Sequence, residues 1–343
     1  MQTPNNQLPV TISLDYELFF GSATGSVDKC LIFPIERLCK ILDKHAFKLS
    51  LFVDACFLIK LRDLSGKYAN LNAEYEKIRN QLKRLSEDGH DIQLHVHPHW
   101  INSHYDGNSW IIDEKNYRLH DFGKEDQKEI IRRCKEELEA ISGNKVFAFR
   151  AGGWCIQPFE EIMDALIMND IWLDSTVYKN GLSNDPIRWF DFRTCEDSVS
   201  WKFSTNPTQK DSSGFFTEIP ISSIKLSPLF FWKMAFFSVF KQEKLTPYGD
   251  GKAMTANKGY YLSRLFSNTY TPASLDGLKA TLLDRLITES LKSCAIGNEH
   301  VNIMGHPKSL TDLSLDELDS CLSKHQSLKS ITFMDFLDKG NNV

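Results

Sequence analysis

Short apolar runs alternate with longer amphipathic segments along most of this 343-residue chain. Apolar runs of four to eight residues are typical of buried strands, and apolar residues three and four positions apart are typical of helices that pack on a sheet. The predicted strands are 10–14, 48–53, 91–95, 146–149, 171–174, 218–221 and 302–304, and the predicted helices are 33–45, 74–88, 124–141 and 157–168. Strands that alternate with helices predict right-handed βαβ units and a parallel sheet covered on both faces.

The region from Tyr178 to Pro272 interrupts this alternation. Residues 178–214 are rich in Ser, Asn, Asp and Trp, and residues 242–272 are rich in Gly, Thr, Asn and Tyr. Both have weak periodicity, so we expect long loops over the mouth of a site. Because no repeat or low-complexity segment divides the sequence, residues 1–343 are predicted to form one domain, with residues 178–272 as an insertion that determines the substrate.

Composition excludes several classes of protein. Apolar residues make up 42% of the chain, enough for a core that needs neither disulfides nor a structural metal. The formal net charge of −5 gives no electrostatic basis for binding nucleic acid, and it argues against binding bare anionic membranes, though not against a lipid-linked substrate. The eight cysteines form no C-x-x-C pair and are expected to be reduced thiols.

Two further features bear on location. The first ten residues lack both a basic start and an apolar segment, so no signal peptide is recognised and a cytoplasmic protein is expected. The longest apolar stretch, residues 226–240, is too short to span a bilayer, so no transmembrane segment is expected. We interpret this stretch as a buried helix, with contact to a membrane surface or a lipid substrate as the alternative.

Two carboxylates follow the first predicted strand. Asp15 and Glu17 are two residues apart, so they point to the same side of an extended chain. Such a pair can bind a metal with one carboxylate and use the other as a base. The alternative is a solvated strand end or a helix cap.

Three histidines, His95, His97 and His99, lie within five residues after the third predicted strand. His95 and His97 share a face if the strand continues, whereas His95 and His99 converge if the chain turns at Pro98. Either pair offers two neutral nitrogen ligands to a divalent metal. The cluster therefore predicts a metal site and leaves the second histidine ligand open.

Polar residues also follow three later strands. Arg150 is followed by Gly152 and Gly153, which allow backbone to approach a ligand closely. A buried Arg needs a carboxylate partner, and Asp174 at the end of the next strand is the natural candidate, for catalysis or for structure alone. His306 follows the last predicted strand and is a candidate general acid.

All five polar features share one position, the carboxyl end of a predicted strand. In a (β/α) barrel these ends form one rim, where catalytic groups gather. Unrelated polar residues rarely fall on one rim by accident. The pattern therefore favours an α/β fold of the distorted (β/α) barrel type, with about seven parallel strands, over an open sheet.

These motifs resemble those of the polysaccharide deacetylases, the carbohydrate esterase group that carries the nodulation-protein-B homology domain. Their first strand ends in Asp-Asp, with the first Asp as base and the second on the metal. Asp15 matches the first, whereas Tyr16 stands in the second position, and Glu17 fits the Asp-x-Glu form of some relatives. The resemblance implies Asp15 as base and Glu17 as ligand, although the two roles could be exchanged.

The second family motif is Gly-His-Glu-Ile-Gly-x-His, with another His four residues later. Residues 89–95 read GHDIQLH, and His99 follows four residues on. The resemblance therefore implies His95 and His99 as ligands. His97 precedes Pro98, as the second ligand of the family often precedes a Pro, and is the alternative to His99.

The remaining motifs imply further roles. Arg150 would orient the base and pair with Asp174, and His306 would protonate the leaving amine. Trp154 would form a wall of the sugar site, and the other substrate contacts would be Tyr16, Trp100, Gly152 and Gly153. The resemblance runs from about residue 10 to residue 310 and implies a distorted barrel, usually of seven strands.

The activity that the resemblance implies is metal-dependent removal of an acetyl group from an N-acetylated sugar, with zinc as the expected metal. The expected substrate is a cytosolic precursor of surface polysaccharide, such as a sugar nucleotide or a lipid-linked oligosaccharide. Two alternatives stay open: hydrolysis of another amide or an acetyl ester at the same site, and a catalytically weak carbohydrate-binding relative, because Tyr16 replaces the second Asp.

Overall fold

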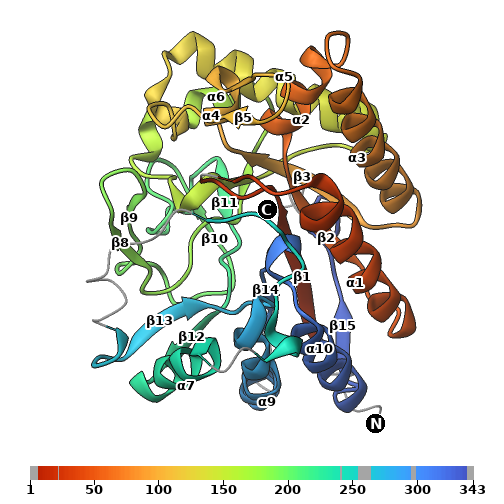
Figure 1. Cartoon of the computed structure of the whole chain (residues 1–343). Helices are drawn as coiled ribbons and strands as arrows, with labels where there is room; N and C mark the ends of the chain where they lie inside the picture. Colours follow the sequence, from red (N-terminus) through yellow and green to blue (C-terminus); the bar gives the residue numbers. More distant parts are fainter. Residues whose placement is uncertain (1–6, 22, 240–241, 254–263, 295–298, 338–343) are drawn as a thin grey trace.

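The computed structural model describes residues 7–21, 23–239, 242–253, 264–294 and 299–337 (Figure 1). Most of the predicted loop at 242–272 is included, but residues 254–263 lie outside the described residues. The first six residues, part of the stretch in which no signal peptide was recognised, also lie outside them.

A mostly parallel sheet of nine strands lies at the centre of the molecule (Figure 1). Seven of its strands are neighbours in the order β14-β1-β2-β3-β6-β7-β11, and every neighbouring pair in this series is parallel. Their bounds are β1 Leu8–Tyr16, β2 Leu49–Asp54, β3 Asp91–Val96, β6 Ala148–Ala151, β7 Leu173–Asp174, β11 Phe216–Glu218 and β14 Val301–Ile303. Each overlaps one of the seven predicted strands.

The other two strands extend this series. β15 (Leu328–Ser330) runs parallel to the first residues of β1, on the edge that β14 continues. β10 (Trp201–Phe203) lies antiparallel beside β11.

An irregular segment after β11 joins the two ends of the sheet. The Ile219 amide donates to the carbonyl of Asp174 at 2.9 Å, and the Ser222 amide donates to the carbonyl of Asn302 in β14 at 2.9 Å. The Asn302 side chain also donates to the carbonyl of Pro220 at 3.3 Å. The predicted distorted (β/α) barrel is confirmed, and its distortion lies where irregular backbone replaces regular strand pairing.

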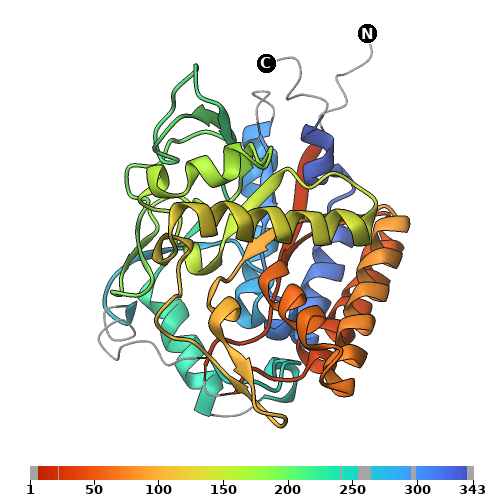
Figure 2. The same ribbon diagram turned by 90° about the horizontal axis from the view of Figure 1, so that it is seen from above.

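Helices cover the outside of the sheet (Figures 1 and 2). They are α1 Phe33–Lys44, α2 Ala55–Leu64, α3 Ala69–Glu87, α5 Lys124–Ser142, α6 Met163–Ile167, α9 Leu283–Cys294 and α10 Asp312–Lys324. The predicted helix at 157–168 is shorter than expected, with a turn of 3-10 helix at Phe159–Glu161 before α6. Pro158 disfavours helical backbone at Gln157, and Ile162, with φ −123° and ψ −14°, separates the 3-10 turn from α6.

The insertion at 178–272 contains more regular structure than two long loops. It supplies β10 and β11 to the main sheet, the hairpin of β8 (Leu182–Asn184) and β9 (Trp189–Asp191), and the antiparallel pair β12 (Ser223–Leu226) and β13 (Thr269–Pro272). The helix α7 (Pro228–Val239) follows β12.

The prediction that the stretch at 226–240 is a buried helix is wrong in its burial. The helix forms, but Leu229 is 76% exposed, Trp232 51% and Phe236 56%. Only one side of α7 has a surface to pack on, where Phe230 and Phe231 contact a small cluster that contains Ile224, Leu226 and Ala273. Within the described ranges, no helix is both long enough and apolar enough to cross a membrane.

Candidate metal centre

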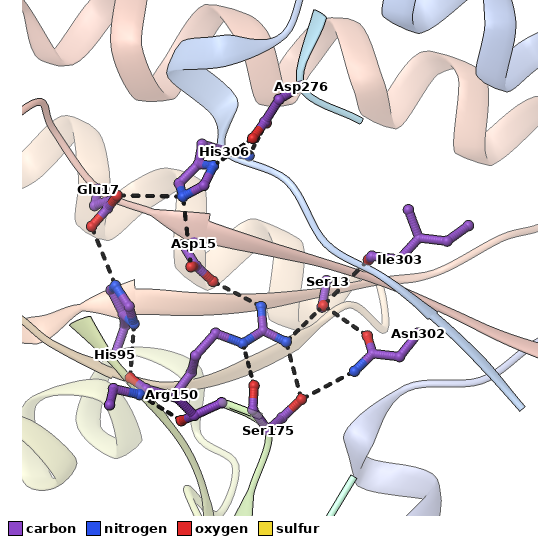
Figure 3. A network of polar contacts seen from close by, with 12 residues as sticks. Ser13, Asp15, Glu17, His95, Arg150, Ser175, Asp276, Asn302, Ile303 and His306 are labelled. Carbon is purple, nitrogen blue, oxygen red and sulfur yellow. Dashed lines mark hydrogen bonds and ion pairs between the residues drawn. The ribbon is translucent and has the colours of Figure 1, made fainter. Parts of the chain in front are cut away.

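The site lies at the carboxyl end of the parallel strands, where β1 and β3 end on either side of β2 (Figure 3). Asp15 is the penultimate residue of β1 and Glu17 follows its last residue, and both carboxylates are buried. Their two-residue spacing places them on the inner side of the barrel, as the sequence predicted. Tyr16 between them points the other way, and its hydroxyl donates to Gln81 of α3 at 2.9 Å. The prediction that Tyr16 contacts substrate is therefore not supported by its orientation.

Glu17, His95 and His97 converge on one point. One potential ligand atom of each residue lies within 4.8 Å of the other two, and all three side chains are buried. His95 Nε2 is 3.2 Å from Glu17 Oε2, and His97 Nε2 also contacts this oxygen. One carboxylate oxygen thus faces two imidazole nitrogens.

The hydrogen bonding of His95 shows that this arrangement suits a cation. His95 Nδ1 lies 2.8 Å from the carbonyl oxygen of Arg150, which can only accept, so Nδ1 carries a proton. In a neutral imidazole, Nε2 then presents a lone pair to the carboxylate oxygen of Glu17. Two acceptors that face each other in a buried site need a positive charge between them, and a backbone carbonyl behind a histidine is the usual support of a metal ligand.

The structure places His97, rather than His99, beside His95 and Glu17. β3 stays extended to Val96, so His95 and His97 lie on one side of the chain. After Pro98 the short helix α4 (His99–Asn102) begins, and the His99 ring, 5.3 Å from that of His97, lies beside the three converging ligand atoms but not among them. The His99 ring packs at 4.7 Å from Phe20, and neither of its nitrogens has a hydrogen-bond partner among the described residues. Burial lowers the pKa of His99 well below its usual range.

Lys308 was not singled out from the sequence, yet it contacts the carboxylate of Glu17. Its ammonium group is buried and donates to Glu17 Oε1 at 2.9 Å and to the carbonyl of Leu18 at 2.6 Å. Burial opposes ionisation of Glu17, but Lys308, His97 and His95 outweigh it and hold the pKa of Glu17 well below its ordinary value. Glu17 is therefore ionised at neutral pH, with Oε1 bound to Lys308 and Oε2 facing the histidines.

Arg150 extends across the barrel interior from β6 to β1. Its guanidinium donates to Asp15 Oδ1 at 2.8 Å, to Ser13 Oγ at 2.9 Å and to the carbonyl of Ser175 at 2.7 Å (Figure 3). The arginine is 1% exposed, so this ion pair is buried and held by hydrogen bonds on several sides. Arg150 fixes one oxygen of Asp15 and leaves the other free to face the site.

Arg150 and Asp174 do not form the expected pair. In the parallel register of β6 and β7, Asp174 is opposite Phe149. Because side chains alternate between the two faces of a sheet, Asp174 projects from the opposite face to Arg150. Asp174 accepts from the hydroxyl of Thr176 at 2.7 Å and from the Thr176 amide at 3.0 Å. The next residue, Ser175, falls on the side of Arg150 and takes the place expected for Asp174.

Asp174 instead lies beside Glu218, its opposite residue in β11. Burial raises the pKa of Asp174, and burial together with Asp174 raises the pKa of Glu218 well above its usual range. Glu218 Oε1 accepts from the Val177 amide at 3.1 Å, whereas Oε2 has no donor in the described part of the chain. A proton shared between the two carboxyl groups satisfies Oε2 and removes one of two adjacent buried charges.

His306 lies close to both carboxylates of β1. Its Nε2 is 3.8 Å from Asp15 Oδ2 and 3.6 Å from Glu17 Oε1, and its Nδ1 is 2.9 Å from Asp276 Oδ2 (Figure 3). Burial alone would lower the pKa of His306, but Asp276 outweighs burial and raises it. Asp276 was missed in the sequence because it lies outside the predicted strands. It holds a proton on Nδ1, so Nε2 is the nitrogen that exchanges protons with the site.

Asp54, the last residue of β2, was also missed, although it directly follows the predicted strand at 48–53. Its Oδ1 accepts from the backbone amide of His97 at 3.3 Å. Burial raises the pKa of Asp54 to about 7. Asp54 thereby holds the backbone that carries His97.

The other predicted substrate contacts divide into two kinds. Trp100 is buried against Phe57, with ring centres 4.7 Å apart, so it belongs to the core. Gly152 lies against the His97 ring, and a Cβ there would come within 2.7 Å of it, so this glycine makes room for a candidate ligand. Gly153 has a φ of 61° and packs against Tyr117, which explains why glycine is used there.

Trp154 is the one predicted substrate contact in this group that faces the insertion. Its ring centre is 5.8 Å from that of Tyr178 and 5.9 Å from that of Phe190, and its side chain is partly exposed. A partly exposed aromatic wall is suited to one face of a sugar ring.

Three solved structures share this fold over nearly the whole chain. A protein described as a polysaccharide deacetylase from Mycobacterium smegmatis matches with a TM-score of 0.51, at 11% identity, over 99% of this chain and 93% of its own. The PuuE allantoinase matches with a TM-score of 0.50, at 11% identity, over 97% and 90%. A 4-α-glucanotransferase from Thermococcus litoralis matches with a TM-score of 0.52, at 12% identity, over 97% of this chain and 40% of its own.

No protein-family model matches this chain, and no curated protein sequence does. At 11–12% identity the three structures establish the fold and nothing further. The chain has the distorted (β/α) barrel fold of the polysaccharide deacetylases, as the motifs implied. An allantoinase and a glucanotransferase share this fold as well, so the fold alone does not define the chemistry, which depends on the side chains at the rim.

Proposed function

We propose that this protein is a metal-dependent hydrolase that removes the acetyl group from the nitrogen of an N-acetylated sugar. The observation that carries the proposal is the convergence of Glu17, His95 and His97 on one point, with Asp15 and His306 beside them. A carboxylate and two imidazoles form a common ligand set for catalytic zinc, which keeps an open position for water and substrate.

Glu17 Oε2, His95 Nε2 and His97 Nε2 are the atoms that would hold the ion, for which we propose zinc. Zinc, when bound, supplies Lewis acidity that polarises a carbonyl and lowers the pKa of water. The contact of His95 Nδ1 with a backbone carbonyl, which turns Nε2 toward Glu17, and the ionised state of Glu17 support this ligand assignment.

Asp15 is suited to act as the base. Arg150 binds its Oδ1 and Lys308 binds the neighbouring Glu17, so these cations balance the buried negative charge. Asp15 Oδ2 has no donor closer than His306 Nε2, at 3.8 Å, and is the oxygen that can take a proton from water. Because Arg150 is itself fixed by Ser13 and Ser175, the carboxylate keeps one orientation throughout.

His306 is suited to act as the acid. Its raised pKa favours a proton on Nε2 near neutral pH, and Asp276 orients the ring through Nδ1. A protonated Nε2 between the two carboxylates of β1 can deliver that proton to the leaving nitrogen of the sugar.

For the substrate, we propose an N-acetylated sugar in a precursor of surface polysaccharide. Trp154, which packs on the buried rings of Tyr178 and Phe190, supports a sugar-binding wall on the side of the insertion. The cytoplasmic location that the sequence led us to expect stays a prediction. The alternative of a binding protein without activity depends on Glu17 failing to reach the ligand group, and the position of Glu17 beside His95 and His97 favours the hydrolase.

Acetate release from a panel of N-acetylated sugar nucleotides and chito-oligosaccharides tests the proposal. The purified protein should hold one divalent ion, release acetate, and lose that activity on chelation and in Asp15→Asn. A parallel panel of acetyl esters distinguishes ester from amide hydrolysis. If the folded, metal-loaded protein releases no acetate from the amide panel, the proposed function is wrong.

A further inference from the structure

The helix α7 presents an apolar face outward. Residues 228–239 read PLFFWKMAFFSV, with Lys233 as the single charge. The exposed residues Leu229, Trp232 and Phe236 lie three and four positions apart, on one face of the helix. The Trp232 indole donates to the carbonyl of Leu265 at 3.1 Å, next to Phe266, which is 75% exposed. We call Leu229, Trp232, Phe236 and Phe266 the apolar patch.

The chain around the apolar patch is basic, although the whole protein is acidic. Residues 219–275 contain two acidic residues, Glu243 and Asp250, and seven basic ones, for a net charge of +5 in a chain of net charge −5. The basic residues are Lys225, Lys233, Lys241, Lys244, Lys252, Lys258 and Arg264. Of these, Lys225 and Lys233 are exposed and flank the start and middle of α7. The net charge of the chain therefore conceals a local charge of the opposite sign.

The segment that follows α7 reaches the rim of the site. The Gly249 amide donates to the carbonyl of Lys308 at 3.0 Å, and the Lys252 amide donates to the carbonyl of Ala23 at 2.8 Å. Lys308 in turn binds the carboxylate of Glu17. In Figure 2, α7 (teal) lies on the same side of the molecule as the hairpin of β4 (His104–Tyr105) and β5 (Trp110–Ile111), which follows the carboxyl end of β3.

We propose that the apolar patch and its surrounding lysines bind an anionic lipid surface, and that the site thereby meets a glycan attached to a lipid. An exposed apolar patch marks a contact with a protein or a membrane, and Trp, Phe and Leu beside Lys are the residues that lie in the headgroup region when a helix binds a membrane surface. Anionic lipids attract the basic residues around it. The lipid contact stands on the surface alone, whereas the lipid-attached substrate rests on the proposed hydrolase function.

The positive charge favours a lipid surface over a second copy of the chain. Two copies that met through this face would bring the exposed Lys225 and Lys233 of each copy together. Like charges across an interface oppose association. An anionic bilayer offers both an apolar layer for Leu229 and Phe266 and negative charge for the lysines.

Vesicle sedimentation tests the proposal with the full chain. The wild-type protein should sediment with phosphatidylglycerol vesicles, less so at high salt, and only weakly with phosphatidylcholine vesicles. Leu229→Ser combined with Phe266→Ser should weaken the partitioning by about tenfold or more, because two apolar side chains leave the bilayer. Lys225→Glu combined with Lys233→Glu should weaken binding to the anionic vesicles specifically.

Met168→Ser is the matched control, because Met168 is 66% exposed and follows α6, on a different part of the barrel. It should bind vesicles as the wild type does. Failure of the wild type to bind anionic vesicles at low salt overturns the lipid proposal, as does unchanged binding by the Leu229 and Phe266 variant. A dimer in sedimentation velocity that this variant abolishes, without vesicle binding, assigns the patch to a second copy instead.

Acetate release from a water-soluble N-acetylated sugar keeps the two proposals separate. It should be the same in the wild type and in the Leu229 and Phe266 variant, because neither residue lies in the site. Vesicle binding without acetate release retains the lipid contact and removes the hydrolase, and the reverse result removes only the lipid contact.

Discussion

The rim of the barrel buries charged side chains, whereas the helix α7 exposes apolar ones. At the rim, Asp15, Arg150 and Glu17 are charged and buried, whereas α7 exposes Leu229 and Trp232 to solvent. The charges at the rim are matched inside the molecule by ion pairs and hydrogen bonds. The exposed side chains of α7 present apolar surface to solvent instead, which suits a contact outside the chain. Folded proteins usually bury apolar side chains and expose charged ones, and both regions depart from this rule. Such departures are expected at functional surfaces.

The largest effect on stability should come from removing Arg150. Arg150→Met leaves Asp15 as an unpaired buried carboxylate and should lower the free energy of unfolding by about 3–5 kcal/mol. Urea denaturation measures the loss, and Asp15→Asn in the same chain should restore part of it. Arg132→Met is the control, because this arginine pairs with Glu129 and Glu136 on the surface and should change stability far less than Arg150→Met does. Equal losses in the two variants would contradict the difference between buried and exposed charge.

Metal affinity should separate two neighbouring histidines. His97→Ala should weaken zinc binding by more than about 100-fold, because it removes one of three converging ligands. His99→Ala should retain one zinc per chain, since its ring lies outside that group. Isothermal titration calorimetry on the two metal-free variants provides the comparison. Loss of zinc in His99→Ala alone would assign the second ligand as the family motif implies.

Replacing Asp276 should shift the pH dependence of activity rather than abolish the activity. Asp276 is the strongest influence that raises the pKa of His306, so Asp276→Asn should lower this pKa and leave only Asp15 and Glu17 to oppose burial. Because His306 must carry a proton to act as the acid, activity should be lost at a lower pH than in the wild type. The alkaline limb of kcat/KM measures this shift. Asp284→Asn is the matched control, since Asp284 makes the same kind of contact with His325 on the surface, and its profile should stay in place.

The carboxyl pair of Asp174 and Glu218 predicts a smaller effect, in which stability falls as pH rises. A carboxyl group whose pKa is raised by folding binds its proton more tightly in the folded state, so stability falls as pH rises above the unfolded pKa. Glu218→Gln keeps the shape and needs no proton. Its melting temperature should fall less than that of the wild type between pH 5 and pH 8. A parallel pH dependence in both proteins would show that Glu218 carries no excess proton.

The smallest effect on stability should come from the exposed helix. Leu229→Ser should change the free energy of unfolding by less than about 0.5 kcal/mol, because the side chain is 76% exposed. Leu51→Ala, in the buried strand β2, should cost about 2–5 kcal/mol. Urea denaturation of the two variants sharpens the comparison between core and patch. A large loss in Leu229→Ser would mean that α7 belongs to the folded core.

Much of the fold could be predicted from the sequence. Each predicted strand overlaps an observed one, although 218–221 shares only Glu218 with β11, and Asp15, His95, Arg150 and His306 lie at or just after the carboxyl ends as expected. These predictions succeeded because apolar runs and helical spacing depend on neighbours in the chain. The two-residue spacing that places Asp15 and Glu17 on one side is likewise a local property of extended backbone.

The partners of these residues could not be predicted in the same way. Arg150 contacts Asp15, whose strand is separated from β6 by two others, rather than Asp174 in the adjacent strand. Register decides this outcome, because Asp174 is opposite Phe149 and so leaves the face on which Arg150 lies. Lys308 and Asp276 were missed for a related reason: their importance lies in contacts with Glu17 and His306 that no spacing in the sequence expresses.

The sequence by itself determined the strands, the edge on which the polar side chains gather, and the residue types available there. Only the tertiary structure decided that His97 joins His95 and Glu17, that Arg150 binds Asp15, and that α7 faces outward. The physical reason is the range of the interactions. Periodicity is set by residues a few positions apart, whereas pairing at the rim and burial of a helix depend on strand register and on the surfaces that distant segments leave available.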